Sequence, residues 1–295
     1  MRVLNLGSMN VDYVYSVPHI IIPGETLATG GRNTFAGGKG LNQSIAMAKA
    51  GLPVYHAGIT GNGGEMLLDA LQQNHVDTSL IQTYDGPVGH TVIQVDKNGQ
   101  NCILLFGGGN QCLTKEFIDE TLSKFGPEDV LVLQNEVNLM PYIIDSAAEK
   151  GLKIVLNPSP FTNEILQWNL KHISVFFINE IEGAQIAGTQ SPEEILKWFA
   201  AQYPDAIVVL TLGSEGSQCL AQGKVYTQKI YPAKAIDTTA AGDTFSGFFL
   251  AQWLAGKTIP ECLDLAARAS SITVSREGAA GSIPTIDEVI KSQQN

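Results

Sequence analysis

Asp243 is the side chain in this sequence whose setting most strongly suggests chemistry. It follows the small residues Ala240, Ala241 and Gly242 and opens an almost wholly apolar stretch that stops at Gly256. Small residues at the start of a helix leave backbone N–H groups open to a ligand, and the positive end of the helix dipole favours an anion there. A carboxylate beside that anion site could take the proton of a substrate hydroxyl while the hydroxyl oxygen attacks a phosphate. Helix capping is an equally good reason for an acid at this position, so both interpretations stay open.

A glycine-rich segment at 35–51, FAGGKGLNQSIAMAKAG, gathers a second set of ligand-binding groups. Gly38 permits close approach of the backbone, Lys39 supplies a cation, and Asn42 supplies a carboxamide in the first turn of an Ala-rich helix. These groups suit a polyhydroxylated ligand, although a tight turn with a solvated lysine would have the same pattern. The spacing is not that of a Walker A loop, and the chain has no GxGxxG fingerprint.

The composition is that of a folded globular protein, with 44% apolar and 16% charged residues. The formal net charge of −11 and the lack of a Lys/Arg cluster argue against nucleic acid as a partner. With this charge, a site for an anionic nucleotide needs a local source of positive potential. The four cysteines lack metal-like spacing, so we expect buried, reduced thiols rather than a disulfide framework or a zinc site.

No targeting or membrane segment is evident in the sequence. The N-terminal stretch MRVLNLGSMN leads directly into a strand-like run, and no apolar stretch approaches about 18 residues. We therefore expect a cytoplasmic protein without a membrane partner.

Strand-like and helix-like segments alternate along the chain, which predicts an α/β fold with a doubly wound, mostly parallel sheet flanked by helices. Continuous apolar runs indicate strands that are buried on both faces. The predicted strands are 3–7, 54–60, 129–134, 153–158, 174–179 and 206–213. The predicted helices are 41–50, 64–75, 114–124, 138–150, 191–202, 243–255, 260–275 and 285–293. We expect one domain over 1–295, with the ligand at the carboxyl ends of the strands.

Two regions, 11–35 and 87–107, depart from this alternation. The second contains the turn signal Asn98-Gly99 between two strand-like runs, so the regions predict a small antiparallel β lid. One apolar face of such a lid would not be covered by the main layers. We expect the lid to close over a ligand and also to pair with a second copy, giving a homodimer.

Two long, separated motifs carry a family resemblance. DTTAAGDTFSG at 237–247 resembles the C-terminal signature of the ribokinase-like, PfkB-type carbohydrate kinases, and GGKGLNQ at 37–43 resembles their N-terminal signature. Shorter segments fall in the family's order along nearly the whole chain: NVD (10–12), QNE (134–136), NEIE (179–182), TLGSEG (211–216) and SREGAAGS (275–282). The resemblance implies a kinase that transfers the γ-phosphoryl group of ATP to a sugar hydroxyl.

The same resemblance assigns roles to individual positions. It implies that Asp243 is the catalytic base and that Ala240, Ala241 and Gly242 form the anion hole. The positions matching the family's sugar-binding residues are Asn10, Asp12, Gly38, Lys39, Asn42, Glu136 and Asp243. The positions matching its nucleotide-binding residues are Asn179, Thr211, Gly213, Ser214, Gly216, Gly242 and Ala267.

Two metal ions are also implied by the resemblance. Asn179 and Glu182 match the NxxE pair that holds magnesium through water. The positions matching the potassium site are Asp237, Thr239, Thr273, Arg276, Gly278 and Ser282. Departures from the family pattern occur at 61–67, which lacks a usual acidic residue, at 105–113, which has glycine where relatives show GAN, and at Ala267, which is small.

The choice of sugar depends on Asn10 and Asp12, a carboxamide and a carboxylate two residues apart that could grip vicinal hydroxyls. With the resemblance, this pair favours D-ribose, which would be converted to D-ribose 5-phosphate. Deoxyribose, fructose, tagatose 6-phosphate and nucleosides remain open as acceptors, and a non-catalytic sugar-binding protein is the alternative from another class. GSMNVD after the first strand disfavours a Rossmann dehydrogenase.

Overall fold

The computed structural model describes residues 1–292, and its centre is a nine-stranded sheet in the order β13-β12-β11-β10-β9-β8-β1-β4-β5. The strands from β11 to β5 in this order run parallel, while β12 and β13 extend one edge in antiparallel pairing. The bounds are β1 Val3–Leu6, β4 Val54–Asn62, β5 Asp77–Pro87, β8 Val130–Gln134, β9 Lys153–Asn157, β10 Ile173–Asn179, β11 Ile207–Thr211, β12 Ser217–Ala221 and β13 Lys224–Gln228.

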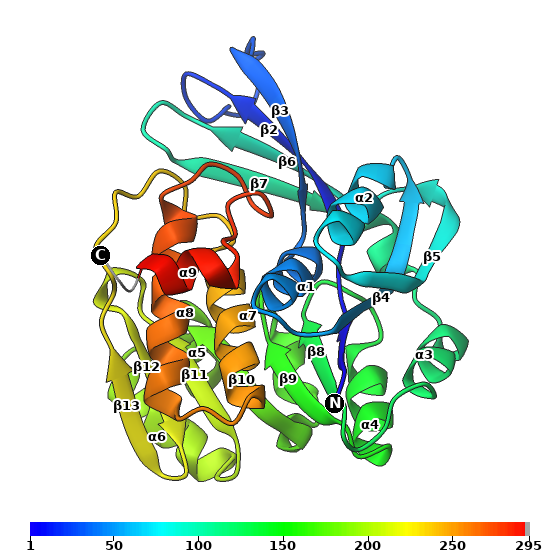
Figure 1. Cartoon of the computed structure of the whole chain (residues 1–295). Coiled ribbons are helices and arrows are strands. Elements are labelled where there is room, and N and C mark those ends of the chain that lie inside the picture. Colours follow the sequence, from blue (N-terminus) through cyan, green and yellow to red (C-terminus); the bar gives the residue numbers. More distant parts are fainter. Residues whose placement is uncertain (293–295) are drawn as a thin grey trace.

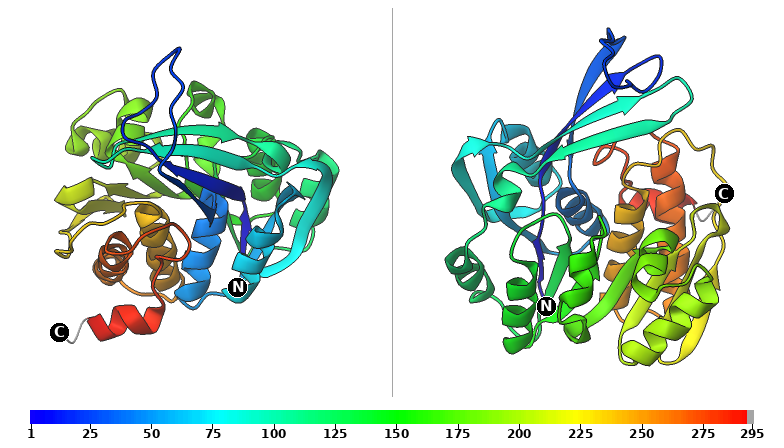
Figure 2. Two further views of the ribbon diagram at one scale, coloured as in Figure 1. Left: turned by 90° about the horizontal axis from the view of Figure 1, so that it is seen from above. Right: turned by 180° about the vertical axis from the view of Figure 1, so that it is seen from behind.

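Helices cover both faces of this sheet (Figures 1 and 2). The α-helices are α1 Lys39–Lys49, α2 Glu65–Gln73, α3 Lys115–Leu122, α4 Met140–Glu149, α5 Glu180–Ala187, α6 Pro192–Gln202, α7 Ala241–Leu254, α8 Ile259–Val274 and α9 Ile286–Ser292. Short 3-10 helices are η1 Gly108–Gln111, η2 Asn163–Gln167, η3 Leu170–His172 and η4 Gly213–Glu215. Within residues 1–292, no helix combines the length and the apolar character needed to cross a bilayer.

The predicted elements are found with small shifts, whereas α5, β5, β12 and β13 are not among them. Most residues of β5 and β13 are exposed or half-buried, because these strands lie at the two edges of the sheet, so they lack continuous apolar runs. The predicted last helix ends at 293, and that end lies outside the described residues, as do the final positions of the expected domain.

Alternate residues of the central strands belong to two separate hydrophobic cores, one on each face of the sheet. In β8, Val130 and Val132 belong to the core beneath α1, α7 and α8, while Leu131 and Leu133 belong to the core beneath α3, α4 and α6. Successive side chains of a strand point to opposite faces, so a strand covered on both faces must be apolar throughout. The predicted doubly wound arrangement follows from this pattern.

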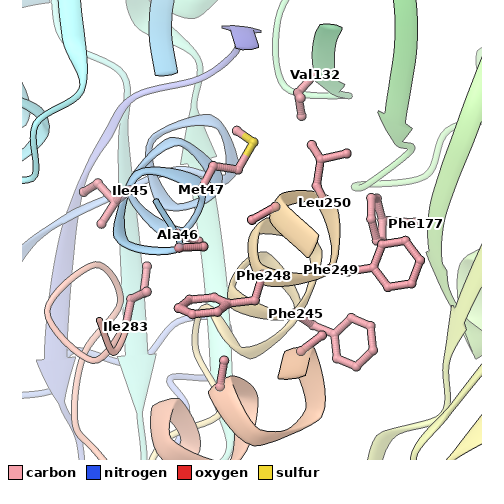
Figure 3. Packing of buried hydrophobic residues seen from close by; sticks show 14 of the residues in the cluster. Ile45, Ala46, Met47, Val132, Phe177, Phe245, Phe248, Phe249, Leu250 and Ile283 are labelled. Atoms are coloured by element: carbon pink, nitrogen blue, oxygen red, sulfur yellow. The ribbon is translucent and has the colours of Figure 1, made fainter. Parts of the chain in front are cut away.

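Helix α7 lies in the first of these cores and packs closely on α1. Phe248 and Phe249 are fully buried (Figure 3), and each stabilises the fold by roughly 1.5–3 kcal/mol. A Cβ atom on Gly247 would lie 2.5 Å from the Cβ of Ala46 and 2.8 Å from the backbone nitrogen of Met47. Glycine is therefore required at 247 for the two helices to approach, and this approach brings the start of α7 against α1.

A second, four-stranded sheet projects from the carboxyl edge of the main sheet (Figure 1). Its order is β3 (Gly31–Gly37), β2 (Asn10–Ser16), β6 (His90–Val95) and β7 (Asn101–Phe106). The outer pairs are antiparallel, as expected, but the central β2–β6 pair is parallel. The reason is that β2 follows β1 along the chain and β6 follows β5. Since β1 and β5 run in the same direction in the main sheet, β2 and β6 also run in the same direction.

The cysteines are all free thiols, but they are not all buried. Cys219 and Cys262 are buried in the core, whereas Cys102 is exposed. The expectation of four buried thiols is therefore wrong, because β7 is the outer strand of the small sheet and has every residue exposed.

Candidate active site

A cavity of about 250 Å³ lies where the carboxyl ends of β9, β10 and β11 meet the start of α7. It is the position at which open parallel sheets bind ligands. The cavity is lined by Lys39, Asn157, Ser159, Phe177, Ile178, Asn179, Glu182, Thr211, Thr238, Ala240, Ala241, Gly242, Asp243 and Ser246. The wall therefore contains predicted sugar-binding, nucleotide-binding and catalytic positions together.

Asp243 lies in the first turn of α7 but does not cap it. The N-cap of α7 is Ala240, which has no side-chain cap, and Asp243 is the third helical residue. Its carboxylate instead accepts hydrogen bonds from Asn42 Nδ2 at 3.1 Å and Gln43 Nε2 at 3.0 Å, both on α1. The carboxylate is thus held at the cavity wall by side chains, and the capping interpretation of the sequence does not describe it.

The three positions predicted to form the anion hole lie in the turn into α7. Ala240 has φ 60 and ψ 9, a left-handed conformation that costs an L-residue roughly 1–2 kcal/mol. The N–H of Ala241 donates to Thr238 O at 3.2 Å, whereas the N–H groups of Gly242 and Asp243 have no hydrogen-bond partner within residues 1–292. A Cβ atom on Gly242 would meet nothing within 4 Å, so this turn is open to the cavity. Two free amides at a helix N-terminus form a site suited to an anion.

Lys39 supplies a cation at the cavity wall. It begins α1 directly after Gly38, whose φ of 92 requires glycine. Burial lowers the pKa of Lys39, but attraction to Asp243, Glu136 and Glu182 outweighs this effect, so its pKa is raised. The ammonium group therefore stays charged in a site that three carboxylates surround.

The positions on β2 and after β8 that were predicted to bind sugar lie next to the start of α1. Asn10 pairs with Gly37 across the β2–β3 ladder, next to Gly38. Glu136 accepts hydrogen bonds from the hydroxyl of Ser8 and, at 3.0 Å, from the backbone N–H of Lys39. Burial raises the pKa of Glu136, and the positive charge of Lys39 opposes that rise.

Asp12 is the second carboxylate on this side. It lies next to Gly37, where a Cβ atom would collide with its side chain, and it accepts a hydrogen bond from Thr91 Oγ1 at 2.6 Å. Burial raises its pKa to about 6, an effect that Thr91 opposes and the charge of Glu136 reinforces. Asp12 can therefore change its charge close to neutral pH.

Several supporting residues were not expected from the sequence. Asn110 Oδ1 accepts from the N–H of Met9 at 3.0 Å, and its Nδ2 donates to Asn10 Oδ1 at 2.8 Å. Since the oxygen of Asn10 is occupied in this way, its NH₂ group is the end left to face a ligand. Ser8, Thr91 and Gln43 also hold site residues. Gln43 lies within GGKGLNQ, which resembles a family motif and was the available signal for it, whereas Asn110 lies in the segment 105–113, which departs from the family pattern.

Asn179 and Glu182, the NxxE pair, cap the N-terminus of α5. Asn179 and Glu182 form a reciprocal capping box at the start of α5, with Asn179 Oδ1 accepting from Glu182 N at 2.8 Å and Glu182 Oε2 accepting from Asn179 N at 3.0 Å. Both residues also line the cavity. Glu182 Oε1 has no hydrogen-bond partner within the described chain, so one carboxylate oxygen remains for a water or a cation.

Of the other positions predicted to bind the nucleotide, some line the cavity and others do not. Thr211 lines it at the end of β11. Gly213, Ser214 and Gly216 form the turn around η4 that follows this strand, but they are not part of the cavity wall. Ala267 is buried in α8 and also lies outside the wall.

The expected potassium positions lie on two adjacent loops and the end of α8. Both carboxylate oxygens of Asp237 accept backbone N–H groups, from Thr239 at 2.9 Å and from Gly278 at 3.0 Å. The other positions make separate contacts: Thr273 with Thr244, Arg276 with Glu288 and Ser282 with Ala279 O. Among residues 1–292, no three His, Cys, Asp or Glu side chains cluster as a metal site would require, so any cation here would depend on backbone, hydroxyl or water oxygens.

Comparison with known proteins identifies the class. Residues 2–286 match the sequence family described as pfkB family carbohydrate kinase, so the chain belongs to this family. The ribokinase of Haemophilus influenzae is 33% identical over 97% of this chain and 96% of its own length, and that of Staphylococcus aureus is 34% identical over 98% of each. The structure of Arabidopsis thaliana ribokinase complexed with ribose and ATP matches with a TM-score of 0.85 and 30% identity, over 98% of this chain and 97% of that one. The predicted family and fold class are confirmed.

Proposed function

We propose that this protein is an ATP-dependent ribose kinase, which transfers the γ-phosphoryl group of ATP to the primary hydroxyl of D-ribose and gives D-ribose 5-phosphate. The observation that carries the proposal is the position of Asp243, a buried carboxylate directly beside the free amides at the start of α7. The full-length similarity to ribokinases, one of them complexed with ribose and ATP, supports both substrates.

In this proposal the acceptor hydroxyl lies against Asp243, which takes its proton as the oxygen attacks phosphorus. The N–H groups of Gly242 and Asp243 stabilise the negative charge on the transferring group, and Lys39 adds a positive charge nearby. Phosphoryl transfer requires mainly positioning and charge stabilisation, and these side chains and amides supply both.

The sugar is proposed to bind between β2 and α1. Asn10 would donate through its NH₂ group, while Asp12 and Glu136 would accept hydrogen bonds from hydroxyls. Asn42 offers a further acceptor, because its Oδ1 is buried and has no partner within residues 1–292 while its Nδ2 holds Asp243. A buried oxygen that accepts no hydrogen bond lowers the stability of the protein, and a sugar hydroxyl would donate the missing hydrogen bond.

The proposed nucleotide site includes Thr211, Gly213, Ser214 and Gly216 beyond β11, with Ala267 at its far side. Glu182, with Asn179, would hold magnesium through water, which fits the carboxylate oxygen that the capping box leaves unused. Bound magnesium neutralises phosphate charge.

Potassium is proposed near Asp237 and Gly278, in the loops that precede α7 and follow α8. The donor set of carbonyl, hydroxyl and carboxylate oxygens fits a hard monovalent cation. It would fix the loop that carries the amides of the anion hole.

We propose one domain over the whole chain, with the four-stranded sheet as a lid built from 11–35 and 87–107. Its outer strand β7 exposes Ile103, Leu104 and Phe106, and Leu104 is 72% exposed. An unpaired edge with apolar side chains is a surface that a second copy can cover, so we propose a homodimer through the lid. The proposed location is the cytoplasm, where ATP is available as phosphoryl donor.

The test is a coupled assay of ADP release with ribose, deoxyribose, fructose, tagatose 6-phosphate and nucleosides as acceptors, each with and without potassium. We expect the highest kcat/KM for ribose and faster turnover with potassium. A preference for nucleosides would overturn the choice of substrate. Absence of ADP release with every acceptor would overturn the kinase assignment.

A further inference from the structure

The carboxylate of Asp243 is held by the carboxamides of two consecutive residues of α1, and these residues differ in what they leave free. Asn42 Nδ2 and Gln43 Nε2 donate to the two oxygens of the carboxylate. We propose that Gln43 is a positioning residue, which fixes the orientation of the Asp243 carboxylate. The inference rests on the proposed function, in which Asp243 accepts a proton from the sugar.

The amide of Gln43 is used completely by protein groups. Its Nε2 donates to Asn157 Oδ1 at 3.2 Å as well as to Asp243, and its Oε1 accepts from Gln134 Nε2 at 2.7 Å. The side chain is only 2% exposed, so no part of it remains for a substrate. Asn42 differs, because its buried Oδ1 has no partner within residues 1–292. The two neighbouring amides therefore have separate tasks, contact with the ligand for Asn42 and orientation of the base for Gln43.

The direction in which Gln43 points is set from outside the cavity. Gln134 Nε2 also donates to Asn5 Oδ1 at 3.1 Å, and Asn5 Nδ2 donates to the backbone carbonyl of Gly40 at 2.7 Å. A backbone carbonyl can only accept, so it fixes which end of Asn5 is the donor, and Asn5 in turn fixes Gln134 and Gln43.

The other end of this amide chain is fixed in the same way. Asn157 Nδ2 donates to the backbone carbonyl of Phe177 at 2.8 Å, so Asn157 Oδ1 must be the end that faces Gln43. Gln134 Oε1 stays buried without a hydrogen-bond partner within residues 1–292. Turning Gln134 over would place that oxygen against the oxygens of Asn5 and Gln43, which cannot donate to it, so the observed orientation keeps a donor aimed along the chain.

The consequence for Asp243 follows from its burial. Its side chain lies in a water-poor site, where hydrogen bonds are stronger than in water and hold a side chain more firmly. Asp243 also needs a defined plane, since a general base must reach the proton that it takes. The chain of Asn5, Gln134, Gln43 and Asn157 joins strands β1, β8 and β9 to α1, and so transmits the rigidity of the sheet to the base.

The test uses Gln43→Met, which keeps length but removes every hydrogen bond, and Gln43→Glu, which replaces a donor by an acceptor. Gln73→Glu, on the exposed end of α2, adds the same charge away from the cavity and is the matched control. For Gln43→Met we expect kcat to fall about 10- to 100-fold with KM for ribose within about 2-fold of the parent. Gln43→Glu, which places an acceptor against the carboxylate of Asp243, should lower kcat further, again with little change in KM. The control should match the parent.

A second measurement makes the outcome independent of turnover. The carboxylate carbon signal of Asp243, assigned by its loss in Asp243→Asn, is recorded by NMR at one fixed neutral pH in the parent, in Gln43→Met and in the Gln73→Glu control. We expect one sharp signal at the same position in the parent and the control, and a displaced or broadened signal in Gln43→Met, because its carboxylate is no longer held in one orientation. An unchanged signal, or a raised KM with unchanged kcat, would overturn the positioning role. Absence of ADP release from the parent would instead contradict the proposed function and leave the NMR signal to decide the inference.

Discussion

The carboxylate of Asp237 accepts a hydrogen bond from the backbone N–H of Gly278 at 3.0 Å, although the two residues are 41 positions apart. Its other oxygen accepts the N–H of Thr239 at 2.9 Å. One side chain thus joins the loop before α7 to the loop after α8. The amides proposed to bind phosphate begin directly beyond this junction, so their placement depends on it.

Replacing Asp237 by Ala should loosen the anion site more than it loosens the fold. We expect kcat to fall about 10-fold and the response to potassium to disappear, because the loop is no longer held in one position. The melting temperature should drop by less than about 4 °C, since only two hydrogen bonds of a half-exposed group are lost. Asp287→Ala, which removes the same charge from an exposed position in α9, is the control. Parent-like turnover and potassium response in Asp237→Ala would contradict the role of this junction.

Binding of ribose should depend on pH through Asp12. Burial, with the nearby charge of Glu136, raises the pKa of Asp12 to about 6, although Thr91 opposes the rise. The ionised form accepts hydrogen bonds from hydroxyls better than the neutral acid, so KM for ribose should increase as the pH falls through about 6. Asp12→Asn should bind more weakly but lose this dependence. A KM that is constant from about pH 5 to 8 in the parent would refute the assignment.

The raised pKa of Asp12 also makes the stability of the fold depend on pH, but in the direction opposite to ribose binding. Because the pKa of Asp12 in the folded chain is above its ordinary value of 3.8, the fold favours the protonated acid. The free energy of unfolding should therefore decrease as the pH rises from about 4 through about 6, and Asp12→Asn should remove this part of the profile. Denaturant unfolding across that range measures it. Parallel profiles for the parent and the variant would show that Asp12 does not contribute.

Glycine should be tolerated at position 240 better than alanine. Ala240 has a φ of 60, and replacement by glycine relieves this left-handed strain at some cost in chain entropy. We expect Ala240→Gly to raise stability by about 0.5–1 kcal/mol, or roughly 1–3 °C in the melting temperature. Ala241→Gly, one residue further into α7, should lower stability by about the same amount. A loss of equal size in both variants would show that Ala240 is not strained.

The local sequence was sufficient to select the groups that are proposed to do the chemistry. Asp243, the small residues before it and the segment around Lys39 were identified by their types and spacing, and their family motifs fixed the fold class. Continuous apolar runs located the central strands for the physical reason that those strands are covered on both faces. The edge strands β5 and β13 were missed because exposed residues interrupt their pattern.

The supporting contacts could not be predicted from local sequence. Asn42 and Gln43 meet Asp243 across 201 and 200 residues, and Asn110 meets Asn10 across 100 residues. Nothing in one segment specifies the side chain that it will contact in the other, since the contact exists only after the sheet and helices have packed. For the same reason the sequence left open whether Asp243 caps its helix, a question that the direction of its carboxylate settles.

The central claim is that Asp243 is the base in phosphorylation of ribose, and Asp243→Asn tests it most directly. The replacement keeps the size of the side chain but removes its ability to take a proton. Ribose affinity is measured by calorimetry, and phosphorylation is measured by ADP release at saturating ATP and ribose. We expect affinity within a few-fold of the parent and a rate lower by about 10²-fold or more. A rate within a few-fold of the parent, with ribose still bound, would contradict the assignment of Asp243 as the base.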